Sequence, residues 1–295
     1  MTLQFSHAGP DFICVGMPKS GTSWLFDQLR GHPDFWMPPA KELHYLGSTA
    51  PKMENSKRLY RHYQKKPEKL EERLPNSQAL DARDIDFFEQ ALNVSGQEMS
   101  FERYRSLFRS KGDSLSGDIT PGYSALPGEK ISAIGKALPA VRAVLLVRDP
   151  VARMWSHISM LSRIGRFKAG KLKKPEKFRA YLEKPRAMIQ MSFATRVARN
   201  WAEHAPQIPF RYFFFDDIIG QPDKVRREVL QYLGADPDKE NGRIPADFNR
   251  KFSKEKLELP DAIRVQLIDY LREELRESAA LFGGRAKAWP VFYGV

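Results

Sequence analysis

A short apolar run that leads through a glycine-bearing loop directly into a helix is the feature that most constrains the fold of this chain. Residues 12–16 (FICVG) have the composition of a buried strand, and apolar residues within 25–29 recur at helical spacing. Gly31 is typical of a helix end. The loop between strand and helix, 16–24, reads GMPKSGTSW. A loop that enters a helix N-terminus presents unpaired N–H groups and the positive end of the helix dipole, so this loop predicts a phosphate site.

Strands and helices alternate along the rest of the chain. Residues 141–147 (VRAVLLV) and 210–215 (FRYFFF) predict two further apolar strands. Helices are predicted around these strands, at about 127–138, 151–162, 222–233 and 260–282. Apolar strands that alternate with helices indicate an α/β fold, with a central parallel β-sheet flanked by helices. We therefore expect one domain over residues 1–295.

Charge and composition exclude some classes of protein. The formal net charge of +12 predicts attraction to anions, which include nucleic acid, acidic membranes, acidic glycans and polyphosphate cofactors. The single cysteine, Cys14, excludes an intrachain disulfide, and its apolar neighbours predict a buried side chain. No segment has the ~18 consecutive apolar residues of a membrane span, and the first residues lack the zones of a signal peptide. We expect a cytoplasmic protein with no membrane span.

The spacing of glycines in the loop is that of nucleoside-triphosphate loops, but the lysine is displaced. Gly16 and Gly21 match the glycines of G-x-x-x-x-G-K-[ST], whereas Thr22 stands where that motif has lysine. The lysine of this loop is Lys19. A lysine inside the loop does not suit a kinase or ATPase that holds β- and γ-phosphates over Mg²⁺.

The run PKSGTSW resembles the 5′-phosphosulfate loop of sulfotransferases that use 3′-phosphoadenosine-5′-phosphosulfate (PAPS), commonly written PKSGTTW. The resemblance implies the P-loop-like sulfotransferase fold. It also implies that the loop binds the cofactor, with Lys19 both holding the 5′-phosphate and meeting the bridging oxygen, and with Trp24 near the adenine. The cofactor-binding residues expected in this loop are Lys19, Ser20, Gly21, Thr22, Ser23 and Trp24.

A second phosphate site is predicted after the strand at 141–147. Arg148 lies at the carboxyl end of this strand, where open α/β sheets bind ligands, and Ser156 follows eight residues later in a helix. Arg-x-Pro followed by serine at this spacing resembles the family's 3′-phosphate motif, with Asp149 where Asn is frequent. An isolated Arg148 could instead pair with Asp149 at the helix start. The resemblance implies 3′,5′-ADP as the product and no required metal, because lysine and arginine supply the positive charge.

The general base is expected shortly after the first helix. Residues 41–46 (KELHYL) are similar to the Lys-Glu-x-His-Phe-Phe run of the glycan branch of the family. The resemblance implies Glu42 as the base, kept ionised by a neighbouring lysine, and places the chain closer to the glycan and bacterial branch than to the cytosolic small-molecule branch. His44 is the rival base, or a residue that orients Glu42.

Four further segments are assigned, the first and the last of them from the same resemblance and the other two from their composition. Residues 117–123 (GDITPGY) are similar to a Gly-Glu-Lys-Thr-Pro-x-Tyr segment, so Thr120, Pro121 and Tyr123 are expected to line the acceptor side, with a strand-to-turn role as the alternative. The segments 48–110 and 163–190 are expected to be acceptor-side insertions, the first of helices and the second a basic loop or loosely packed helix. A basic loop at 248–256 is the candidate to close the cofactor site, through Arg250, Lys251 and Lys254.

These features predict a sulfotransferase that moves a sulfuryl group from PAPS to a hydroxyl or amine of an acceptor. Glycans, lipids and small alcohols remain open as acceptors, and the basic charge suits an anionic one. One alternative is a P-loop small-molecule kinase, for which Asp216 or Asp217 could hold Mg²⁺. The other is a non-catalytic polyanion-binding protein. No nucleic-acid partner is expected, because the sequence has no zinc-ligand spacing, RNP-like run or recognition-helix signature.

Overall fold

The centre of the fold is a parallel β-sheet. A computed structural model describes residues 9–66, 80–168, 170, 172, 174–184, 189, 191–239, 244–248 and 257–295. The strands of this part of the chain pair in the order β2–β1–β3–β4, and every pairing is parallel. Their bounds are β1 Phe12–Gly16, β2 Gly117–Ile119, β3 Arg142–Val147 and β4 Phe210–Phe214. The predicted α/β class with a central parallel sheet is therefore confirmed.

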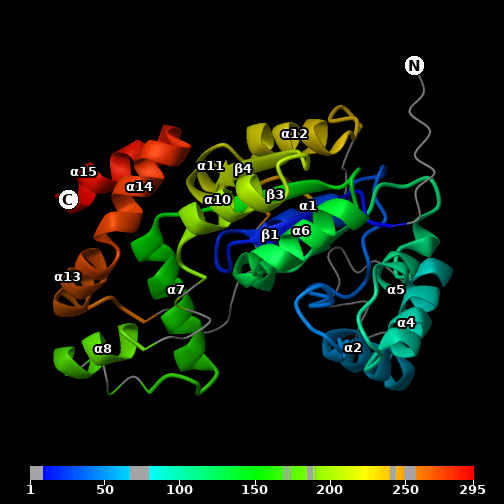
Figure 1. The fold of residues 1–295 in the computed structure, drawn as a ribbon, viewed down its shortest axis with the longest axis horizontal. Coiled ribbons are helices and arrows are strands. Elements are labelled where there is room, and N and C mark those ends of the chain that lie inside the picture. Colours follow the sequence, from blue (N-terminus) through cyan, green and yellow to red (C-terminus); the bar gives the residue numbers. More distant parts are fainter. Residues whose placement is uncertain are drawn as a thin grey trace.

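The helices lie on both faces of the sheet and at both of its ends. Figure 1 shows α2, α4 and α5 at one end of the molecule and α13, α14 and α15 at the other, with the sheet between them. The helices are α1 Thr22–Arg30, α2 Glu54–Lys65, α4 Ala82–Val94, α5 Phe101–Ser106, α6 Gly128–Ala137, α7 Pro150–Arg163, α8 Pro175–Leu182, α10 Ala194–His204, α11 Phe215–Gly220, α12 Pro222–Leu233, α13 Asp261–Tyr270, α14 Arg272–Phe282 and α15 Ala288–Tyr293. Short 3₁₀ helices are η2 Arg109–Lys111, η3 Pro121–Ala125 and η5 Gly284–Lys287.

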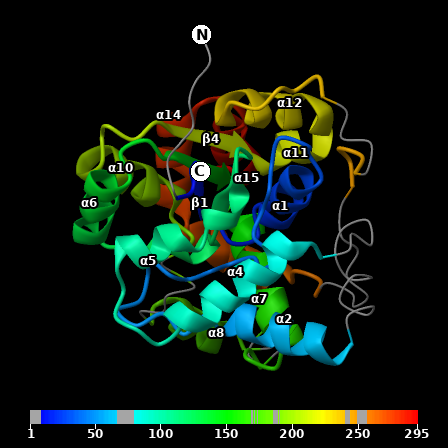
Figure 2. The ribbon, with the colours of Figure 1, turned by 90° about the vertical axis from the view of Figure 1, so that its right-hand side faces the viewer.

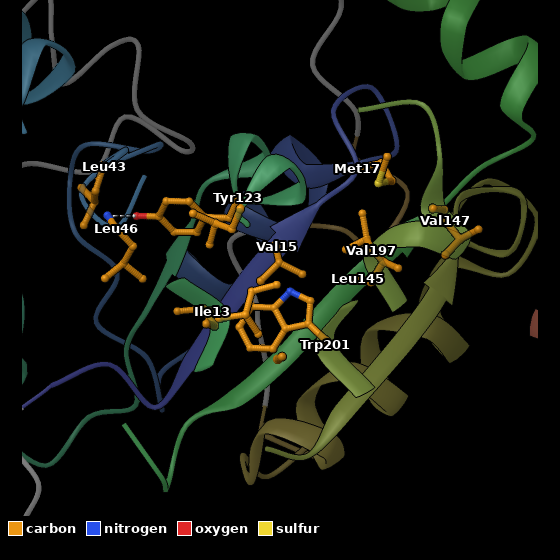
Figure 3. Packing of buried hydrophobic residues seen from close by; sticks show 14 of the residues in the cluster. Ile13, Val15, Met17, Leu43, Leu46, Tyr123, Leu145, Val147, Val197 and Trp201 are labelled. Carbon is orange, nitrogen blue, oxygen red and sulfur yellow. Dashed lines mark hydrogen bonds between the residues drawn. The ribbon is translucent and has the colours of Figure 1, made fainter. Parts of the chain in front are cut away.

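The core consists of two layers, because strand side chains alternate between the two faces of the sheet. Successive strand side chains point to opposite faces, so Ile13 and Val15 of β1 pack in one cluster and Phe12 and Cys14 in the other. The first cluster includes residues of α6 and α10, such as Trp201, and is shown in Figure 3. The second includes residues of α1 and α12. Figure 2 shows these two pairs of helices on opposite sides of the sheet.

Two predicted segments differ from the structure. The helix predicted at 260–282 is divided at Leu271 into α13 and α14. This division lets α13 contact α7 and α8 while α14 contacts α10. The segment 163–190, expected as a basic loop or loosely packed helix, contains the well-packed helix α8, in which Phe178 and Leu182 are fully buried one helical turn apart.

Candidate active site

The predicted phosphate loop follows the carboxyl end of β1, which is an interior strand of the sheet. Open α/β folds bind ligands at this end of their strands. Gly21 has a φ of 98° at the N-cap of α1, and an added Cβ would lie 3.1 Å from Ile218 and 3.3 Å from Phe215. The positive φ therefore favours glycine here, and a Cβ would be in tight contact with these two side chains. Ser20 is fully buried, and its Oγ has no hydrogen-bond partner in the described part of the chain. An unsatisfied buried hydroxyl in a loop of this kind is suited to a ligand oxygen.

A second lysine reaches this loop from the segment after α1. The Nζ of Lys41 donates hydrogen bonds to Thr22 Oγ1 and Ser23 Oγ, both at 3.1 Å. Each hydroxyl accepts from Lys41 and can therefore donate its own hydrogen to an anion. The sequence predicts for Lys41 only the role of a neighbour that keeps Glu42 ionised. Its contact with the loop could not be found from spacing, because it joins Lys41 to the first turn of α1, 18 and 19 residues earlier in the chain.

Glu42 and His44 form an ion pair beside the same lysine. His44 Nε2 lies 3.4 Å from Glu42 Oε2, and Lys41 Nζ lies 3.9 Å from Glu42 Oε1. Burial raises the pKa of Glu42, but the interaction with His44 and the charges of Lys41 and Lys19 outweigh burial, so the pKa lies below its usual range. The interaction with Glu42 raises the pKa of His44, against the effect of burial. The carboxylate is thus ionised at neutral pH.

The backbone is unusual at the same positions. Lys19, Glu42 and His44 have φ values of 71°, 62° and 52°, and Met53 is the remaining non-glycine residue with positive φ in the described ranges. Left-handed conformations of this kind cost on the order of 1 kcal/mol each and cluster at functional sites. Three of the four fall on residues singled out from the sequence.

A buried network holds the segment that carries Glu42 and His44. Asp118 accepts hydrogen bonds from Thr120 Oγ1 and Tyr123 Oη, both at 2.6 Å, and from Tyr104 Oη at 3.1 Å. The backbone N–H of Leu46 donates to Tyr123 Oη at 3.2 Å, as Figure 3 shows, and that of His44 donates to Thr120 Oγ1 at 3.4 Å. The network thus anchors the segment at His44 and at Leu46.

The expectation that Thr120 and Tyr123 line the acceptor side is wrong. Their exposed fractions are 0% and 2%, and their hydroxyls point into the Asp118 network. The alternative, a strand-to-turn role, is the one that the structure has: β2 ends at Ile119 and η3 follows. Burial raises the pKa of Asp118, which the three hydroxyl donors oppose.

Arg148 joins the second predicted phosphate site to the first. Its Nη1 donates to the backbone oxygen of Lys19 at 2.8 Å, and its guanidinium lies 4.3 Å from the ring centroid of Phe215. Asp149 does not form an ion pair with Arg148 in the described structure. Its carboxylate instead caps α7 and accepts from Tyr293 Oη at 2.6 Å. Ser156 is half-buried in α7.

Trp24 is buried at the start of α1, where its Nε1 donates to the backbone oxygen of Ala246 at 2.6 Å. Gln28 donates to the backbone oxygen of Pro245 at 2.8 Å. The segment that leads into the predicted closing loop is therefore attached to α1. Of that loop, Arg250, Lys251 and Lys254 lie outside the described residues.

Other predicted features concern reactivity and ligands. Cys14 is fully buried, and burial raises its pKa to about 12, as expected for an inert packed thiol. In the described ranges, no group of three or more His, Cys, Asp and Glu residues is placed to hold a metal ion. None of the helices described here has both the length and the apolar character needed to cross a membrane.

The chain belongs to the sulfotransferase family, whose sequence model matches residues 10–239. Its structure is similar to the crystal structure of a sulfotransferase from Alicyclobacillus acidocaldarius, with a TM-score of 0.61 and 20% identity over 95% of this chain and 98% of that one. The predicted family and sulfotransferase fold are thus confirmed, and the chain is a transferase. Weaker similarities include the sulfotransferase domain of the Synechococcus PCC 7002 olefin synthase, with a TM-score of 0.48 and 16% identity over 91% of this chain and 96% of that one. No curated protein matches the chain.

Proposed function

We propose that this protein transfers the sulfuryl group of PAPS to a hydroxyl or amine of an acceptor, with Glu42 as the general base. The observation that carries the proposal is the position of Lys41. Its Nζ contacts both loop hydroxyls at 3.1 Å and lies 3.9 Å from the Glu42 carboxylate. One side chain therefore joins an anion-binding loop to an ionised carboxylate, an arrangement that suits sulfuryl transfer because it places a base beside the bound donor.

The residues of the loop fit a phosphosulfate. Ser20 offers a buried hydroxyl without a partner, Thr22 and Ser23 have hydroxyl hydrogens to donate, and the first turn of α1 adds backbone N–H groups. When bound, PAPS supplies the sulfuryl group as a mixed anhydride with its 5′-phosphate. Lys19 and Lys41 supply positive charge where the leaving phosphate gains negative charge.

Glu42 is suited to accept the proton of the acceptor. A carboxylate with a lowered pKa is present in its basic form across the neutral range. His44, with its raised pKa, holds one oxygen of the carboxylate and stabilises its charge. We therefore assign His44 to positioning Glu42, and Glu42 to accepting the proton.

Arg148 is assigned to the 3′-phosphate, together with Ser156. Its guanidinium is fixed by the carbonyl of Lys19 and the ring of Phe215, and the remaining N–H groups of its fork can bind a phosphate. Because Arg148 holds the backbone of Lys19, the two phosphate sites are mechanically connected. Phe215 supports the arginine in this arrangement.

A cavity of about 310 Å³ supports an acceptor with an apolar part. Leu46 lies in its wall. It is four residue steps along the chain from Glu42, a span of at most about 14 Å. An acceptor could thus place an apolar body in the cavity and a hydroxyl at Glu42. Residues that line the cavity are Leu46, Ser48, Thr49, Glu98, Met99, Phe101, Lys130, Ala133 and Ile134.

The kinase alternative gains no support from the carboxylates offered for it. Asp217 is paired with Arg285 at 2.7 Å, and the lysine that contacts the loop hydroxyls, Lys41, comes from outside the loop. The polyanion-binding alternative rests on net charge alone.

Binding of nucleotides tests the proposal directly. Thermal unfolding would be followed with 3′,5′-ADP, with 5′-AMP and with ATP–Mg²⁺. A ligand at 100 times its dissociation constant adds about 2.7 kcal/mol to the free energy of unfolding, which is readily measured. We expect a large shift with 3′,5′-ADP and a small one with 5′-AMP. A shift with ATP–Mg²⁺ alone would support the kinase instead.

A further inference from the structure

A buried arginine contacts the backbone of the phosphate loop. Arg153, in the first helical turns of α7, has an exposed fraction of 1%. Its guanidinium contacts the backbone oxygen of Pro18 at 3.5 Å, His157 Nδ1 at 3.3 Å and the hydroxyl of Ser192. All of these partners are uncharged groups. No carboxylate forms an ion pair with Arg153 in the described part of the chain, and its Nε has no hydrogen-bond partner there.

Among the described residues, no opposite charge thus compensates that of Arg153. Burial lowers its pKa to about 9, with a smaller contribution from Arg148, so it remains cationic at neutral pH. Burial also lowers the pKa of His157 to about 4, so the imidazole is neutral and its Nδ1 can accept from the arginine. Helical side chains point back toward the N-terminus, and the positive end of the α7 dipole adds to the charge of Arg153.

Another buried arginine of the chain shows the usual arrangement. Arg30 is also largely buried, but its Nη2 lies 3.2 Å from Asp84 Oδ2, with both side chains 5% exposed. Buried charges in proteins are normally paired in this way, because an unpaired one is destabilising. The absence of such a partner for Arg153, together with its contact to the phosphate loop, points to an anion that is supplied by a ligand.

We infer that Arg153 is a positioning residue whose buried charge is compensated by the anionic co-substrate bound in the loop above it. This inference rests on the proposed function. Arg153 supports the loop through the Pro18 carbonyl and contributes to the positive field at the 5′-phosphate, without touching the reacting atoms. In the ligand-free protein the buried charge of Arg153 is uncompensated and destabilising, and binding of the anion compensates it.

The test compares Arg153→Met with Arg30→Met in the whole chain, with 3′,5′-ADP and 5′-AMP as probes. Without ligand, we expect R153M to unfold at the wild-type temperature or above it, because an unpaired buried charge is removed. We expect its dissociation constants for both probes to rise at least tenfold. R30M should lose stability, since Asp84 is left buried and unpaired, while it binds both probes as the wild type does.

The outcomes separate the two proposals. A wild-type protein that gives no shift with 3′,5′-ADP overturns the proposed function. If the wild type binds but R153M binds equally well, or if R153M loses stability as R30M does, Arg153 is only a structural residue. Arg153→Gln retains donors for Pro18 and removes the charge. R153Q with wild-type affinity would also overturn the inference, whereas tenfold weaker binding by R153Q would support it.

Discussion

His44 Nε2 lies 3.4 Å from Glu42 Oε2, and both residues hold this contact with left-handed backbones. Such backbones persist only where surrounding groups fix them. Here Asn55 Nδ2 donates to the backbone oxygens of Lys41 and Glu42 at 3.3 Å, and Thr120 accepts from the N–H of His44. The position of the carboxylate is therefore determined by contacts from two separate segments, one at Asn55 and one at Thr120.

Substitution of the proposed base should separate catalysis from binding. We expect Glu42→Gln to lower kcat by at least about 100-fold, the usual contribution of a general base. Binding of 3′,5′-ADP should stay within about threefold, because the amide is isosteric with the carboxylate. Initial rates and calorimetric titration measure the two quantities. Full transfer activity in E42Q would show that another group accepts the proton.

The ion pair predicts a pH dependence. Interaction with His44 keeps the pKa of Glu42 low, and in its absence burial would raise that pKa. In His44→Gln, the pKa of Glu42 should therefore rise, and the acidic limb of the kcat/KM profile should move to higher pH. Profiles of wild type and H44Q measured between pH 4 and 8, a range that spans roughly the usual values for Glu and His, check this. If His44 were itself the base, H44Q would instead lose activity at every pH.

Removal of Lys41 should weaken cofactor binding. In Lys41→Met, Thr22 and Ser23 lose the donor that orients their hydroxyls, and the loop loses one positive charge. We expect the dissociation constant for 3′,5′-ADP to rise by about tenfold, the equivalent of about 1.4 kcal/mol. Lys136→Met on the exposed side of α6 is the matched control for the loss of charge. Equal effects of the two substitutions would mean that only net charge matters.

Two tyrosines of the Asp118 network offer a matched pair. Both donate to Asp118, but only Tyr123 also accepts from the N–H of Leu46. Tyr123→Phe should lower the free energy of unfolding by about 1–3 kcal/mol, because it leaves that buried N–H unsatisfied, and should also lower kcat. Tyr104→Phe should lower stability with little change in kcat. Urea unfolding and initial rates measure these effects, and equal losses of kcat would contradict the anchoring role.

Filling the cavity should lower kcat/KM for the acceptor and leave cofactor binding unchanged. Ala133→Phe places a ring among the residues that line it. For acceptors with an apolar body, we expect kcat/KM to fall about tenfold or more, with unchanged binding of 3′,5′-ADP. Ala133→Ser, which hardly changes the volume, is the control. If A133F acts on all acceptors equally, including the smallest alcohols, the cavity is not an acceptor site.

Much of the sheet and its flanking helices could be predicted from local patterns. The strands β1, β3 and β4 consist mostly of apolar residues, and the helices beside them show apolar side chains at a period of 3.6 residues. The strand β2 has three residues and no such pattern. Its position depends on pairing with β1, which a short run cannot reveal. The division at Leu271 likewise follows from the different partners of α13 and α14.

The sequence by itself determined the class of fold, the phosphate loop and the family, because each depends on residues that are close together in the chain. Only the tertiary structure decided how these residues meet. Three features depend on contacts between segments that are distant in sequence: the contact of Lys41 with the loop, the burial of Tyr123 and the unpaired charge of Arg153. Hydrogen bonding and burial depend on distance in space, and composition and spacing along the chain do not fix those distances.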